Sequence, residues 1–200
     1  MVDFESIPSD TLGLLAAKQV INRALNISSS SLGGPPDTYS LNESFEVWSA
    51  YEDKIIDPGL SFADAVYNTG VWHIQIKKSS DAESEAIAYA EATPLGPGFA
   101  DWDIDGVFRG QELAKKIDLV GRWIDENIKD ESLVARLVVL EGYQTTVFWL
   151  INPSEGSTGK QIIVVINAPQ KDALFSIPFT YSPDKFIQEL CRLQHIEGIT

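Results

Sequence analysis

The sequence predicts an α+β domain whose antiparallel sheet combines a C-terminal three-stranded meander with an N-terminal hairpin, packed by two or three helices. The meander is indicated by three apolar runs, 133–141, 145–151 and 160–167, which turn-forming residues separate. The hairpin is indicated by residues 70–78, where apolar and polar side chains alternate as in a half-buried strand. Residues 85–92 alternate as well, so we expect them to return as the second arm, although their Ala and Glu content also suits a helix.

Two helices have the apolar repeat needed to cover such a sheet. Residues 110–128 carry apolar side chains at helical spacing, and a last helix is predicted after Ser182, its N-cap, with Pro183 at its first position. The run from Ile162 to Ile166 is almost wholly apolar, so we expect this strand to be covered on both faces and to be central in its sheet. The two helices are the candidates to cover its second face.

The N-terminal part of the chain is expected to be organised separately. Residues 1–26 contain an apolar helical repeat over 11–25, which needs a partner surface. Residues 27–38 are rich in Ser, Gly and Pro and are typical of a linker. We expect the helix to dock on a single α+β domain at 39–200, or to reach across to a neighbouring subunit of a homo-oligomer. Within that domain, residues 44–57 are compatible with a strand or a short helix.

Composition limits the classes of partner. The 200 residues have 44% hydrophobic side chains, which suits a globular fold, and a formal net charge of −14. That charge repels phosphate backbones and anionic lipid, so we expect neither nucleic acid nor membranes as partners. The single Cys191 excludes an intramolecular disulfide, and the first residues show no export signal, so we expect a cytoplasmic protein.

One motif points to a specific chemistry. Its acids and glycine reproduce the spacing of the twelve-residue EF-hand calcium loop, D-x-D-x-D-G-x5-E. Gly106 would permit the sharp turn that this loop needs. The predicted calcium ligands are four carboxylates and one backbone carbonyl: Asp101, Asp103, Asp105, Glu112 and the carbonyl of Val107. The helix that follows an EF-hand loop is present in the pattern, but Pro and Gly residues at 94–98 occupy the place of the preceding one.

The same residues also describe an amphipathic strand. Trp102 and Ile104 alternate with Asp101, Asp103 and Asp105, which predicts a strand with its acids toward solvent and its apolar side chains buried. Glu112 would then be an acid in the first turn of a helix, where the helix dipole favours it. We favour the strand interpretation and keep calcium binding as its alternative.

No catalytic constellation is recognisable elsewhere in the sequence. Cys191 and His195 lie four residues apart on one helical face, but we favour a buried thiol beside a surface histidine, because no positioned Asn or oxyanion loop is recognisable. His73 lies on the polar face of its strand, where we expect solvation. We therefore expect a non-catalytic module that binds a protein partner or a small-molecule ligand. The alternatives are a calcium-stabilised or calcium-regulated domain, with Ca2+ as its one cofactor, and an enzyme whose catalytic residues the sequence does not single out.

Overall fold

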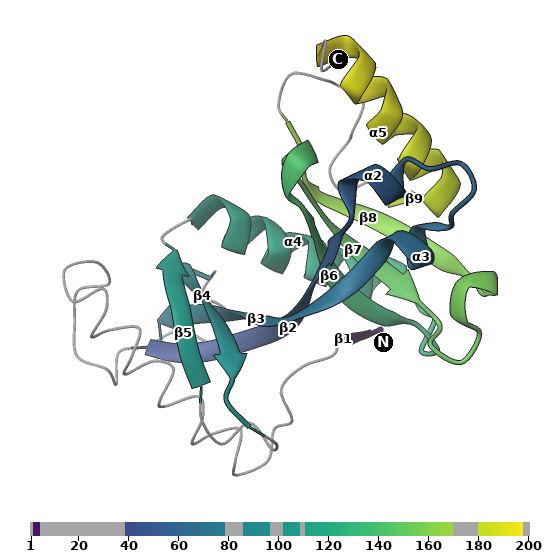
Figure 1. Cartoon of the computed structure of the whole chain (residues 1–200). Coiled ribbons are helices and arrows are strands. Elements are labelled where there is room, and N and C mark those ends of the chain that lie inside the picture. Colours follow the sequence, from purple (N-terminus) through teal and green to yellow (C-terminus); the bar gives the residue numbers. More distant parts are fainter. Residues whose placement is uncertain are drawn as a thin grey trace. The chain divides into compact units, whose positions relative to one another are not determined.

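The computed structural model describes residues 2–4, 39–78, 86–96, 102–108, 111–169 and 180–197 of the chain (Figure 1). These residues form two compact units. The first contains Met1–Phe4, Val47–Thr69 and Val120–Thr200, and the second contains Glu5–Glu46 and Gly70–Leu119. β2, β3 and α4 contribute residues to both units, and each unit is described below by itself.

The described residues form a mixed α+β fold. Its nine strands pair in the order β5-β4-β3-β2-β6-β7-β8-β9, and β1 pairs with β6 beside this path. The strands are β1 (Asp3–Phe4), β2 (Tyr39–Ala50), β3 (Val66–Lys78), β4 (Ala88–Pro94), β5 (Trp102–Phe108), β6 (Val134–Leu140), β7 (Thr145–Ile151), β8 (Gln161–Asn167) and β9 (Thr180–Tyr181). The helices are α2 (Glu52–Ile55), α3 (Phe62–Ala65), α4 (Gln111–Asn127) and α5 (Pro183–Glu197), with short 3-10 helices η2 (Glu141–Tyr143) and η3 (Gly156–Thr158).

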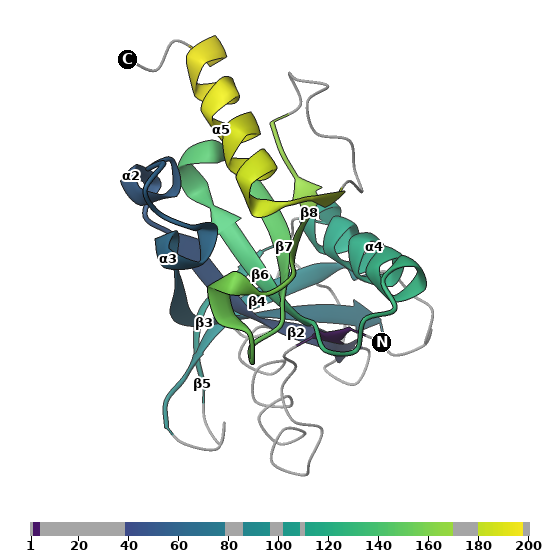
Figure 2. The ribbon, with the colours of Figure 1, turned by 90° about the vertical axis from the view of Figure 1, so that its right-hand side faces the viewer.

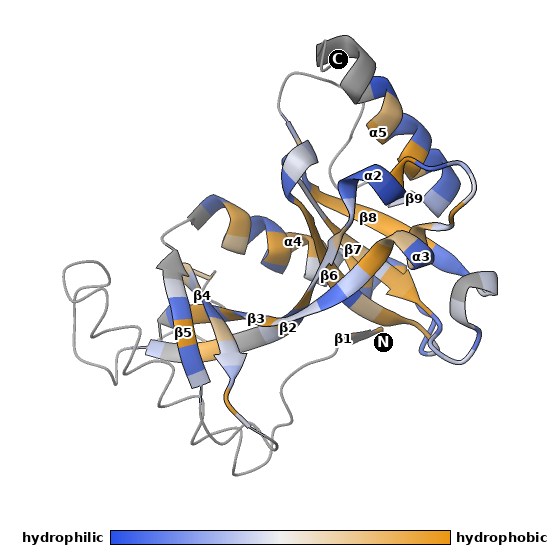
Figure 3. Ribbon diagram, in the orientation of Figure 1, coloured by the Kyte–Doolittle hydropathy of each residue, from blue (hydrophilic) through white to orange (hydrophobic). Residues whose placement is uncertain are grey.

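The first unit is built on the predicted meander. β6, β7 and β8 pair in antiparallel register, with Val138 opposite Val147 and Val147 opposite Val165. Every residue of β7 is buried, and Ile163–Ile166 of β8 are buried as well. Figure 3 shows that both strands are mostly hydrophobic. The meander is therefore confirmed, as is the expectation that β8 is covered on both faces. β8 is not central in its sheet, however, because its other neighbour is only the two-residue β9 at the end of the strand order.

The strands that pair with the other edge of β6 run parallel to it, whereas the sequence predicted a purely antiparallel sheet. β1 pairs with it in parallel through Asp3 and Val134, and β2 pairs with it in parallel through Val47 and Leu137. The sheet is also larger than a meander and a hairpin. Periodicity reports which residues share a face, but it does not report which distant segment a strand will pair with, so the two parallel pairings were not predicted.

The core of the first unit is aromatic. Phe62 of α3 contacts Trp149 of β7 and Phe186 of α5 edge-on, at ring-centroid distances of 5.5 Å and 5.9 Å. Edge-on contacts are favoured by the quadrupoles of aromatic rings, and here they hold α3 and α5 against β7. Figure 2 shows α5 beside β8 and β9, with α2 and α3 next to each other. The predicted last helix is thus confirmed as α5, which begins at Pro183.

The second unit contains the predicted hairpin. β3 and β4 pair in antiparallel register from Trp72–Ala92 to Ile76–Ala88, and β5 continues the sheet on the far side of β4. One face of this sheet is apolar, and its two tryptophans, Trp72 and Trp102, meet edge-on at 6.3 Å. The hairpin prediction is confirmed, and so is the helix expected at 110–128, which is α4.

Two further expectations have mixed outcomes. The ambiguous segment 44–57 is strand as far as Ala50 and then a helix of one turn, α2, so both interpretations apply to part of it. The helix expected at 11–25 and the linker at 27–38 lie outside the described residues. Within the described part of the chain, no helix is long and apolar enough to cross a membrane.

Candidate functional site

Residues 102–108 of the segment that carries the calcium motif form the strand β5, and Glu112 lies in the first turn of the helix α4. Trp102 and Ile104 of β5 are buried, whereas Asp103 and Asp105 are exposed. Val107 is paired with Ala90 of β4. The backbone is therefore extended where a calcium loop would turn, in agreement with the amphipathic strand described above.

A bulge in the ladder changes the direction of this strand near its acids. Glu91 pairs with Gly106 and Ala92 with Ile104, so Asp105 is the extra residue. The carboxylate of Asp105 accepts a hydrogen bond of 3.0 Å from the hydroxyl of Thr93. Glu112 is exposed in the first turn of α4.

The five predicted calcium ligands are only partly placed. Asp101 lies outside the described residues, and among those that are described no three His, Cys, Asp or Glu side chains form a group suited to a metal ion. The structure places Asp103 and Asp105 on β5, and Glu112 on α4. Calcium binding by this segment stays a prediction.

The polar face of the second unit is buried, which the sequence did not indicate. His73 is only 3% exposed, and Gln75 beside it donates a hydrogen bond of 3.2 Å to the carbonyl of Ala114 in α4. At the next position on this face, Lys77 forms an ion pair of 3.4 Å with Asp118 of the same helix. The first turns of α4 thus cover polar side chains, and the expectation that His73 is solvated is wrong.

His73 lies in an environment that opposes its protonation. Its ring stacks on Tyr89 at 4.0 Å, and its Nε2 has no hydrogen-bond partner among the described residues. Burial lowers the pKa of His73 to about 3. Burial also raises the pKa of Tyr89, and the nearby Glu91 carboxylate adds to this increase. The imidazole is therefore neutral at physiological pH.

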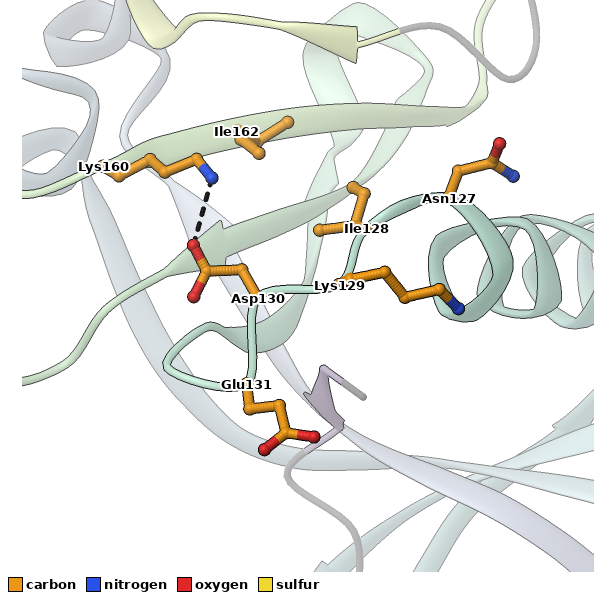
Figure 4. A pocket seen from close by; sticks show the side chains of 7 residues that line it. All are labelled: Asn127, Ile128, Lys129, Asp130, Glu131, Lys160 and Ile162. Atoms are coloured by element: carbon orange, nitrogen blue, oxygen red, sulfur yellow. Dashed lines mark hydrogen bonds and ion pairs between the residues drawn. The ribbon is translucent and has the colours of Figure 1, made fainter.

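A shallow groove of about 490 Å³ lies in the first unit after the end of α4 (Figure 4). Ile128 and Ile162 supply its apolar lining. Its charged side chains are engaged with protein groups: Lys160 forms an ion pair of 3.0 Å with Asp130, and Lys129 donates to the carbonyl of Asp125. Hydrogen bonds from Ser132 and Lys160 lower the pKa of Asp130, which stabilises this pair as charged groups. Lys160 and Asp130 therefore neutralise each other within the groove, while the Lys160 side chain remains 58% exposed.

The first unit exposes three large side chains around its two shortest helices. Tyr51 precedes α2, Leu60 lies between α2 and α3, and Tyr67 follows α3; they are 46%, 36% and 38% exposed. The two tyrosine rings lie against each other at a tilt of 32°, with centroids 4.5 Å apart, and Lys54 Nζ lies 4.2 Å from the centroid of Tyr51. We call Tyr51, Leu60 and Tyr67 the aromatic surface.

The segment that carries the aromatic surface is firmly held. Tyr51 donates a backbone hydrogen bond of 3.1 Å to Ala65, which closes residues 51–65 into a loop. Ser61 and Asp64 form a capping box at the start of α3, and Phe62 of that helix is buried in the core. The segment that carries the exposed rings is thus held in place by backbone hydrogen bonds and by a buried side chain.

The proposed thiol and imidazole pair is only half described. Cys191 is partly buried in α5, whereas the side chain of His195 lies outside the described residues. Tyr143 is a further buried group nearby: burial, with smaller contributions from Cys191 and Glu52, raises its pKa to about 12. This raised pKa keeps the phenol protonated, and its hydroxyl lies 3.5 Å from the carbonyl of Glu52, to which it donates.

Comparison of this chain with known proteins finds no matching protein family, no matching curated protein and no matching solved structure.

Proposed function

We propose that this chain is a non-catalytic binding module and that a protein partner docks on the aromatic surface. The observation that carries the proposal is the close contact between the rings of Tyr51 and Tyr67, which remain 46% and 38% exposed although each has a large apolar ring. Tyrosine is enriched in protein interfaces because it buries a large area while losing few rotamers. This ring contact restrains both side chains in advance, so a partner orders them at little further cost.

A protein partner suits this surface better than a small ligand does. Small-ligand sites are concave and enclose most of the ligand, whereas the aromatic surface consists of side chains that project from Tyr51, Leu60 and Tyr67 into solvent. The segment that carries them resists rearrangement, because Phe62 contacts both Trp149 and Phe186 in the core. A pre-formed, rigid and partly apolar patch is what an interface without induced fit requires.

The proposal can be tested with a random peptide library displayed on phage. Selection on the wild-type protein should enrich peptides whose affinity falls at least about thirtyfold in the double variant Tyr51→Ser, Tyr67→Ser, as expected for hot-spot residues. The matched control is Leu119→Ser, which removes a 52% exposed side chain from the second unit and should leave binding unchanged. Enriched peptides that bind the double variant as well as the wild type would contradict the proposal.

A further inference from the structure

We propose that the partner segment is basic, with Lys or Arg side chains beside an apolar anchor. This inference rests on the proposed function, because it names the chemistry of what docks on the aromatic surface. The exposed charged side chains of residues 51–68 are four acids and one lysine. The acids are Glu52, Asp53, Asp57 and Asp64, and the lysine is Lys54.

One more acid belongs to the same neighbourhood. The carboxylate of Glu52 lies against Gly142, where a β-carbon would collide with it, and Glu141 is the exposed neighbour of that glycine. Glu141 therefore extends the acidic rim from α2 to η2. The field of these carboxylates favours a cation over an anion at the aromatic surface.

The chain itself contains an example of the contact that we infer. Lys54 Nζ lies 4.2 Å from the centroid of the Tyr51 ring, which is within the range of a cation–π interaction. Tyr67 has the same type of ring, its centroid lies 4.5 Å from that of Tyr51, and 38% of its surface is exposed. A Lys or Arg from a partner can approach Tyr67 as Lys54 approaches Tyr51, while the acids of the rim pair with neighbouring cations of the partner.

The net charge of the whole chain selects among possible occupants. At −14, a second copy of this chain or an acidic protein would be repelled as it approached the rim. A basic segment would be attracted from a distance, and its association rate would fall as salt screens the charges. Charge thus favours a basic partner over self-association at this surface.

The test uses two sets of synthetic peptides that share their apolar positions and differ only in charge, one carrying Arg and Lys and the other Asp and Glu. We expect the basic set alone to bind the full chain, in a manner that depends on Tyr51 and Tyr67. Neutralising the rim with Glu52→Gln, Asp53→Asn and Glu141→Gln should weaken binding about tenfold at low salt. The matched control neutralises three exposed acids elsewhere in the same unit, Glu126→Gln, Glu155→Gln and Asp184→Asn, and should change binding little.

The outcomes separate the two proposals. Equal binding of both peptide sets, still lost in the tyrosine variant, would overturn the basic partner and leave the docking surface standing. An equal loss of affinity in the rim and control variants would also overturn it, because net charge alone would then explain the binding. Peptide binding that is unchanged when Tyr51 and Tyr67 are replaced would overturn the proposed docking surface as well.

Discussion

Acidification should destabilise the second unit through His73, and the size of the effect follows from its burial. The unfolded chain protonates this imidazole at its ordinary pKa of 6.5, whereas the folded protein holds the pKa at about 3. Between these two values the unfolded state binds more protons than the folded state, so stability falls as the pH falls. Above pH 6.5 the imidazole is neutral in both states and this effect is absent.

The expected loss between about pH 8 and about pH 5.5 is about 1.4 kcal/mol, because the lower value lies about one unit below the unfolded pKa. At this lower pH the folded imidazole is still neutral. The sequence pI of about 4.4 also keeps the chain negatively charged there, away from its isoelectric point. The chain contains other ionisable groups, so the contribution of His73 is measured by comparison with a variant that lacks the imidazole.

The variant His73→Phe isolates the contribution of His73 protonation to the pH dependence of stability. A phenyl ring can still stack on Tyr89 but does not titrate, and it removes the unpartnered Nε2. Urea unfolding at both pH values should show that wild type loses about 1.4 kcal/mol more than the variant does. Amide exchange over Trp72–Ile76 and their partners in β4 would report the second unit directly. The same pH dependence in both proteins would refute the reasoning, because it would mean that His73 titrates freely in the folded state.

Three other changes test the packing, the backbone and the metal hypothesis. Phe62→Ala should lower the free energy of unfolding by about 3–5 kcal/mol in urea titrations, because it empties the contact with Trp149 and Phe186; a loss below about 1 kcal/mol would contradict this packing. Gln144→Gly should raise the free energy of unfolding by about 1 kcal/mol, since Gln144 has a left-handed φ of 48°, and Gln144→Ala should not. Because β5 is extended, we expect equal melting temperatures in calcium and in chelator, for wild type and for Glu112→Gln; stabilisation of wild type alone by several degrees would instead establish calcium binding.

Local patterns in the sequence predicted where helices and strands lie better than they predicted which strands pair with one another. The apolar repeats located α4, α5 and the three strands of the meander, because burial of one face imposes a period that can be read along the chain. β1 spans only Asp3 and Phe4, which is too short to show any period. Its parallel pairing with β6 depends on where two remote segments meet, and no local pattern encodes that.

The candidate site was harder to predict for a related reason. Alternation placed His73 correctly on the polar face of β3, but no local pattern indicated that α4 would cover that face. Tyr51 and Tyr67 are sixteen positions apart, and each alone is typical of a core or an interface. Only the hydrogen bond from Tyr51 to Ala65, which closes the segment between them, brings the rings together.

The parallel pairing of β1 with β6 has a consequence for how the chain folds. Asp3 meets Val134, so the pairing closes a loop of about 130 residues, at an entropic cost of about 4 kcal/mol. A strand of two residues cannot offset that cost unaided. We therefore expect β1 to join late, after β6, β7 and β8 have formed. Until then the edge of β6 at Val134 and Ala135 stays open, and during that interval a strand from another molecule can compete for it.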